Sequence, residues 1–157
     1  MVYSIDMFAT NLTPYNWTLA DPAAVTNWGS VAQQPQPVLS GQSNVPIGRF
    51  EAAKGTWTGT DGVVLFNDGF PWNNGLVLTL GVKMPFVGDN KCIIGESALS
   101  WFQGEDNVSY FVEALFDSEV ATSDRVAYDG YHLWCTIDQG TQVTANIYMT
   151  PIDTAQK

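Results

Sequence analysis

The chain is poor in basic residues. Only 6 of its 157 residues are Lys or Arg, against 16 that are Asp or Glu, and the formal net charge is -10. Binding to nucleic acid requires Lys and Arg to neutralise phosphates, and electrostatic attachment to anionic lipid requires basic clusters. The composition therefore argues against nucleic acid as a partner and against charge-driven membrane attachment. We interpret the acidity as a source of solubility.

Charge of either sign is scarce as well. Charged residues make up 14% of the chain, whereas about a quarter is usual. The surface must then be built from Ser, Thr, Asn, Gln and Gly, which is common on strands and uncommon on exposed helices, where Glu and Lys are favoured. The hydrophobic share of 45% is that of a globular protein. We predict one all-β domain over residues 1–157.

Residues for catalysis and metal binding are also few. The single histidine, His132, lies in an apolar segment, and no GxSxG sequence is present, so a nucleophile–histidine–acid triad is not favoured. We interpret His132 as a structural or edge-of-sheet residue. Carboxylate pairs for glycoside hydrolysis stay open among sixteen acids, but only Glu113 lies inside a strongly apolar segment. We predict no enzyme activity, no cofactor and no metal site.

The two cysteines lack the spacing of a zinc site. Cys92 and Cys135 are far apart in the sequence, and there is no CxxC pair. Both lie in apolar runs, which favours two buried free thiols. A disulfide across facing strands is the alternative.

Long hydrophobic runs are missing too. None approaches the length of a membrane span, and the first residues, MVYSIDMFATN, have an acid within the apolar stretch and no basic region. We expect no signal peptide. The sequence predicts a soluble protein that is cytoplasmic, exported by a non-classical route or already mature.

Short apolar runs and frequent turn signals are what the sequence has instead. They predict a β-sandwich or barrel of ten or more strands. The segment 108–116 is predicted to be a buried strand, because β-branched and aromatic residues dominate it, and 117–124 a single helical turn. The hairpin prediction at 131–149 rests on the turn Asp138-Gln139-Gly140. The other expected strands are 2–9, 15–20, 25–31, 46–52, 55–59, 62–67, 75–84, 91–94 and 99–102.

Aromatic residues are abundant, with six Trp, six Tyr and eight Phe. Most belong to a core, but Trp72 follows Phe70-Pro71 in a loop bounded by turn residues, and such loop tips face solvent. Trp101 lies in a similar polar setting and is a second candidate. Exposed aromatic rings suit a lipid interface and stack on sugar rings.

The stretch from Gly59 to Phe86 resembles the actinoporin-like superfamily, which includes the aegerolysins and the fungal fruit-body lectins. The resemblance rests on the strand 59–66, the strand 76–80 and the sequence Met84-Pro85-Phe86. It implies a compact β-sandwich whose partners are membrane lipid head groups or cell-surface glycans. It also implies that Pro85 and Phe86 begin a head-group loop.

We therefore predict a non-enzymatic binding protein that recognises membrane lipid or glycan through loop aromatics. Because residues 2–9 read as a strand, no membrane-inserting helix is expected, and a cytolysin or insecticidal toxin role would need a partner pore-forming protein. The alternatives are a sugar-binding lectin without membrane activity and a self-assembling structural protein, a homo-oligomer. The predicted ligand-binding residues are Phe70, Trp72, Asn73, Phe86, Asp89, Asn90 and Trp101.

Overall fold

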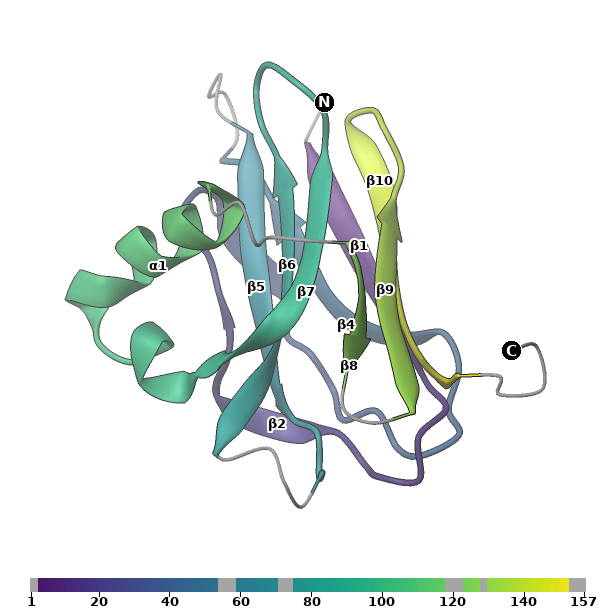
Figure 1. The fold of residues 1–157 in the computed structure, drawn as a ribbon. Coiled ribbons are helices and arrows are strands. Elements are labelled where there is room, and N and C mark those ends of the chain that lie inside the picture. Colours follow the sequence, from purple (N-terminus) through teal and green to yellow (C-terminus); the bar gives the residue numbers. More distant parts are fainter. Residues whose placement is uncertain (1–2, 54–58, 71–74, 118–122, 128–129, 153–157) are drawn as a thin grey trace.

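Two β-sheets pack face to face in the computed structural model, with one helix against the outside of the smaller sheet (Figure 1). The structure describes residues 3–53, 59–70, 75–117, 123–127 and 130–152. The predicted all-β sandwich is confirmed. The elements are β1 (Ser4–Asn11), β2 (Thr18–Val25), β3 (Ser30–Gln33), β4 (Val45–Glu51), β5 (Thr60–Asn67), β6 (Leu76–Met84), β7 (Lys91–Ala98), the 3-10 turn η1 (Leu99–Phe102), α1 (Glu105–Asp117), β8 (Asp124–Ala127), β9 (Tyr131–Ile137) and β10 (Gln142–Pro151).

The larger sheet is built around the first strand. Its order is β3-β4-β1-β10-β9-β8, and β1 pairs in parallel with β10 and antiparallel with β4. Side chains alternate between the two faces of a strand, so Ile5, Met7 and Ala9 of β1 are buried between the sheets. Asp6 and Phe8 are less buried, which is the pattern of a strand with one face in the core.

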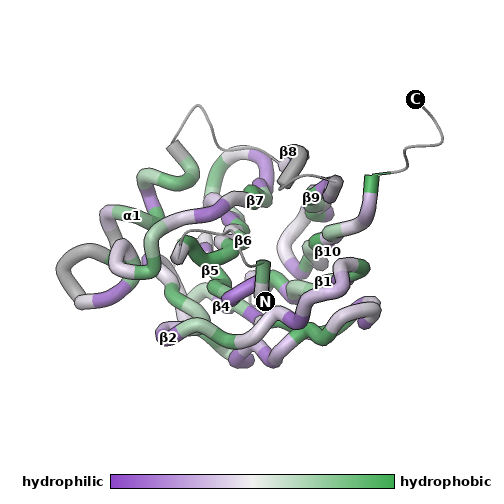
Figure 2. The backbone as a smooth tube through the Cα atoms, turned by 60° about the horizontal axis from the view of Figure 1, so that its bottom comes forward, coloured by the Kyte–Doolittle hydropathy of each residue, from purple (hydrophilic) through white to green (hydrophobic). Residues whose placement is uncertain are grey.

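The smaller sheet, in the order β2-β5-β6-β7, is covered on both faces. One face joins the larger sheet in a core that contains Phe50, Phe66 and Ile147. The other packs Val63 and Leu65 of β5 against α1. Figure 2 shows α1 beside β5, β6 and β7 and away from β1, β9 and β10. Burial on both faces explains why β5 is a continuous apolar run.

The prediction of a strand at 108–116 is wrong, because α1 occupies this segment. The apolar residues Val108, Phe111, Val112, Leu115 and Phe116 have the i, i+3, i+4, i+7 and i+8 spacing of one helix face. That face packs on the smaller sheet. Helical periodicity and burial against the sheet therefore outweighed the low helix propensity of aromatic and β-branched residues.

Three other local predictions need correction or fall outside the described chain. The predicted strand 99–102 is the 3-10 turn η1. Most of the predicted strand 55–59 and the core of the helical turn predicted at 117–124 lie outside the described residues.

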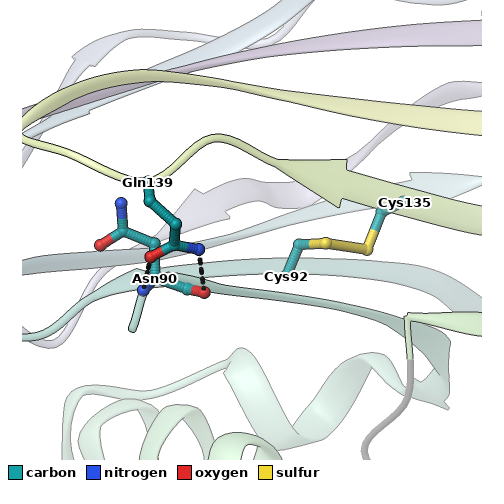
Figure 3. The surroundings of a disulfide bond; sticks show 4 residues. All are labelled: Asn90, Cys92, Cys135 and Gln139. Carbon is teal, nitrogen blue, oxygen red and sulfur yellow. Dashed lines mark hydrogen bonds between the residues drawn. A yellow bond between two sulfur atoms is a disulfide. The ribbon is translucent and has the colours of Figure 1, made fainter. Parts of the chain in front are cut away.

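A disulfide joins the two sheets. Cys92 of β7 is bonded to Cys135 of β9, with the two Cα atoms 6.3 Å apart (Figure 3). The prediction of two free thiols is wrong, and the alternative of a bond across facing strands is correct. The sequence left both open because it does not show which strands face each other.

Candidate functional site

The predicted site residues are divided between the two ends of the sandwich. In the pairing of β6 with β7, Lys83 is opposite Lys91 and Leu76 is opposite Ala98. The loop 85–90 therefore lies at one end of these strands, and η1, which follows β7, lies at the other, roughly 25 Å away. Phe86, Asp89 and Asn90 are at the first end, which we call the Phe86 end. Phe70 and Trp101 are not part of it.

Phe70 is a core residue. Its side chain is 2% exposed and its ring packs between those of Tyr15 and Tyr131, at centroid distances of 4.6 and 5.3 Å. The backbone N–H of Phe70 donates to Asp68 Oδ1 at 3.1 Å, an Asx-turn that reverses the chain. The expectation of an exposed ring at position 70 is wrong, because this turn directs the side chain inward. Trp72 and Asn73 lie outside the described residues.

Trp101 is half exposed, at 41%, and stacks on Phe111 of α1 with ring centroids 5.0 Å apart and planes 9° apart. Tyr110, which is 70% exposed, meets the edge of the same Phe111 ring. Trp101 thus has one ring face against the helix, and its role in ligand binding stays a prediction.

Asn90 connects two loops at the Phe86 end. Its side-chain Nδ2 donates to the backbone oxygens of Asp138 and Gly140 at 3.0 and 3.1 Å. Its backbone N–H and C=O bond the side chain of Gln139 at 2.8 and 3.2 Å (Figure 3). Both amide hydrogens are therefore already used, and the residue is 7% exposed. Asn90 therefore holds the two loops together, and because it also lines the recess between them, its role in ligand binding stays a prediction.

These two loops surround a hollow of about 230 Å³ at the Phe86 end. The β6–β7 loop supplies Pro85, Phe86 and Gly88, and the β9–β10 loop supplies Gln139 and Thr141. Phe86 is 49% exposed and the neighbouring Val87 is 81% exposed, while Asp89 is exposed nearby. The arrangement offers protruding apolar side chains next to a small polar recess.

A buried carboxyl group lies at the start of β5, at Asp61. Asp61 is fully buried, and its Oδ1 accepts hydrogen bonds from the backbone N–H groups of Asn27 and Trp28 at 2.7 and 3.0 Å. Among the described residues, no group hydrogen-bonds its Oδ2. Burial raises the pKa of the Asp61 carboxyl above its ordinary value, and the Glu113 carboxylate adds to the rise, although the hydrogen bonds oppose it.

Glu113, the acid of the apolar segment, connects α1 to its surroundings. It accepts a hydrogen bond from Asn27 Nδ2 at 2.8 Å and lies 3.5 Å from Lys83 Nζ. The Lys83 ammonium also lies over the rings of Trp28 and Phe116, 5.3 and 5.6 Å from their centroids. These contacts hold the helix, the β2–β3 loop and β6 together.

His132 lies on β9, where its ring stacks on Trp134 at 4.6 Å and its Nε2 contacts Asp124 Oδ1. Among the described residues, no three His, Cys, Asp or Glu side chains are grouped as metal ligands would be. In the same part of the chain, neither helix has the length and hydropathy needed to cross a bilayer.

The two packed sheets and the loops at their ends define a β-sandwich. Among solved structures, the lipid binding protein Nakanori superposes with a TM-score of 0.71 at 15% identity, over 94% of this chain and 71% of that one. The lectin XCL from Xerocomus chrysenteron superposes with a TM-score of 0.55 at 14% identity, over 96% and 100%. The expected resemblance is confirmed as a likeness of fold. No protein-family model and no curated protein sequence matches the chain.

Proposed function

We propose that this protein is a non-enzymatic binding protein that recognises a lipid head group at a membrane surface through its Phe86 end. One observation carries the proposal: Phe86 and Val87 protrude beside a recess at the end of a rigid sandwich. Large side chains exposed in this way are suited to the interfacial layer of a bilayer. The likeness of fold to a protein described as lipid binding supports the same class of ligand.

Contacts to the lipid head group must add to the apolar contact that Phe86 and Val87 make with the membrane. Two side chains bury too little area for stable attachment by themselves, so the polar recess between the loops supplies the remaining contacts. The exposed Asp89 and the net charge of -10 disfavour anionic lipids. A zwitterionic surface is therefore the proposed target.

Substitution of Phe86 by Ala tests the proposal. We expect the protein to bind vesicles of phosphatidylcholine and sphingomyelin, and Phe86→Ala to weaken binding roughly tenfold, which corresponds to about 1.4 kcal/mol. Co-sedimentation with the vesicles measures this. Leu12→Ala is the matched control, because Leu12 is 42% exposed and lies near the opposite end of β1. Equal binding by the Phe86→Ala variant and the unsubstituted protein would refute the proposal.

The recess could receive a sugar of a cell-surface glycan instead, and the fold likeness to a lectin favours testing this. Free monosaccharides in the sedimentation assay separate the two ligands, since they block glycan binding and leave lipid binding intact.

A toxin role would require a partner or a homo-oligomer to form the pore, and dye release from the same vesicles tests it. Trp72, Asn73 and Trp101 stay predicted contacts, but Trp101 lies at the end opposite Phe86 and would contact a separate ligand.

A further inference from the structure

A covalent bond and a group of hydrogen bonds join the two loops of the recess at the Phe86 end. The β6–β7 loop belongs to the smaller sheet and the β9–β10 loop to the larger one. Asn90 is the last residue before β7, and Cys92 is the second residue of that strand. On the other sheet, Cys135 is in β9 and Gln139 lies in the loop that follows. Figure 3 shows the disulfide close to the contacts between Asn90 and Gln139.

The hydrogen bonds between the loops depend on the distance between the two sheets. The Asn90 backbone N–H donates to Gln139 Oε1 at 2.8 Å, and Gln139 Nε2 donates to Asn90 O at 3.2 Å. Asn90 Nδ2 donates to the backbone oxygens of Asp138 and Gly140. All four bonds therefore run from the loop of one sheet to the loop of the other. Because hydrogen bonds of this kind span about 2.7–3.2 Å, a displacement of about 1 Å between the loops would break most of them.

The disulfide fixes the distance between the sheets next to these loops. Two bonded sulfur atoms are about 2.05 Å apart, whereas two thiol sulfurs approach only to van der Waals contact, at about 3.5–4 Å. The side chains of Cys92 and Cys135 lie in the close-packed core between the sheets, at 8% and 5% exposure, and have little room to rotate apart. Reduction therefore requires β7 and β9 to separate by about 1.5 Å at this point.

The bonded strands lie at a margin of the sandwich, where they can separate more easily than strands in the middle of a sheet. β7 is the last strand of the smaller sheet, and β9 is followed in the larger sheet by β8, a strand of four residues (Figure 1). Strands with few neighbours open at a lower free-energy cost than central strands. Such local opening gives a small thiol access to the two sulfur atoms.

We infer that binding at the Phe86 end is redox-sensitive. The disulfide between Cys92 and Cys135 holds the two loops in the binding arrangement, and its reduction separates them and weakens binding. This inference rests on the proposed function and adds the regulation of the same site. The protein then binds its target in an oxidising environment and releases it where thiols are abundant.

The chemical step is thiol–disulfide exchange with a small thiol. A thiolate attacks one sulfur of the disulfide, the S–S bond breaks, and the other cysteine leaves as a thiolate that takes up a proton. A second thiolate then attacks the mixed disulfide and releases the first cysteine in the same way. Two electrons and two protons are thus transferred, and the two small thiols leave as one disulfide.

Two measurements on the whole chain, oxidised and reduced with dithiothreitol, test the inference. In hydrogen exchange followed by NMR, the Asn90 backbone N–H is expected to exchange about tenfold faster after reduction, because its bond to Gln139 is lost. The N–H of Met7, in the middle of the larger sheet, is the internal control and is expected to stay protected. In co-sedimentation with phosphatidylcholine and sphingomyelin vesicles, the reduced protein is expected to bind at least about fivefold more weakly, since the recess contacts are lost.

Two variants separate the effect of the bond from other effects. The double substitution Cys92→Ala with Cys135→Ala is expected to behave as the reduced protein does and not to respond to dithiothreitol. Phe86→Ala keeps the disulfide, so it is expected to weaken vesicle binding while the Asn90 N–H stays protected.

Equal exchange of the Asn90 N–H in the oxidised and reduced protein overturns the inference, because the disulfide would then not position the loops. Equal or tighter vesicle binding by the reduced protein overturns it as well. So does loss of protection at Met7 on reduction, because the whole sheet would then unfold. Faster exchange at Asn90 with no vesicle binding by either form would refute the proposed lipid function and support the thiol-dependent opening of the recess.

Discussion

At the residue scale, the carboxyl group of Asp61 combines two opposing effects. Its Oδ1 satisfies two backbone N–H groups of the β2–β3 loop, while burial penalises the charged form and raises the pKa. A carboxyl group whose pKa is raised by folding stabilises the fold most below its unfolded pKa. That contribution is lost as the pH rises from the unfolded pKa through the folded pKa.

Asp61→Asn keeps the Oδ1 acceptor and removes the titration. We therefore expect the free energy of unfolding of Asp61→Asn, relative to that of the unsubstituted protein, to increase as the pH rises from about 4, the ordinary value for Asp. Urea unfolding of both proteins at a series of pH values measures this difference. A difference independent of pH would contradict the raised pKa.

Asp61→Ala provides the comparison, because it leaves the N–H groups of Asn27 and Trp28 without their acceptor. An unsatisfied buried donor costs about 1–3 kcal/mol, so this variant is expected to be destabilised at every pH.

Single-residue environments were the least predictable from the sequence. Phe70 was expected at an exposed tip and is buried, because one Asx-turn reverses the direction of its side chain. The sequence did not indicate that the Nδ2 of Asn90 donates to carbonyl groups of a loop about fifty residues later in the chain. Phe86 was expected at the start of an exposed loop, and it is 49% exposed.

At the scale of elements, α1 depends on one buried face. Val112 is fully buried against the smaller sheet, whereas Tyr110, two residues earlier, is 70% exposed. We expect Val112→Ala to lower the free energy of unfolding by about 1–3 kcal/mol, from lost burial and the cavity left behind. Tyr110→Ala is the matched control and is expected to change it by less than about 0.5 kcal/mol. The urea midpoints of the two variants test this expectation. Equal midpoints would show that the packing of α1 contributes little to the stability of the fold.

Strands were predictable where turn chemistry marked their ends. The hairpin of β9 and β10 was predicted from Asp138-Gln139-Gly140 and is confirmed, as are β5 and β6 within two residues. The helix was missed because its residues have strand propensity and only their spacing indicates a helix. Propensity is a weak guide when an element is stabilised by tertiary burial.

At the scale of the whole molecule, the disulfide crosslinks the two sheets through β7 and β9. Removing such a bond costs about 2–4 kcal/mol. We expect reduction by a thiol, or the double substitution Cys92→Ala with Cys135→Ala, to lower the free energy of unfolding by this amount. Urea unfolding with and without reductant measures it, and the double variant should not respond to reductant. An unchanged midpoint for the reduced unsubstituted protein would show that packing alone holds the sheets together.

The sandwich itself was predictable, because short apolar runs between turns have few other solutions. The pairing of its strands was not. No local sequence pattern indicates that β7 and β9 face each other, which is what allows the disulfide. None indicates that Phe86 and Trp101 lie at opposite ends of the sandwich. Both follow from which strands become neighbours, and that depends on the burial of the whole chain.

The parallel pairing of β1 with β10 affects how the protein can be made. β1 lies in the middle of its sheet, between β4 and β10, so it lacks one neighbour until the chain has been synthesised as far as β10. The sheet cannot be completed before that point. Until then the apolar side chains of β1, such as Ile5 and Met7, remain exposed and can associate with other unfolded chains.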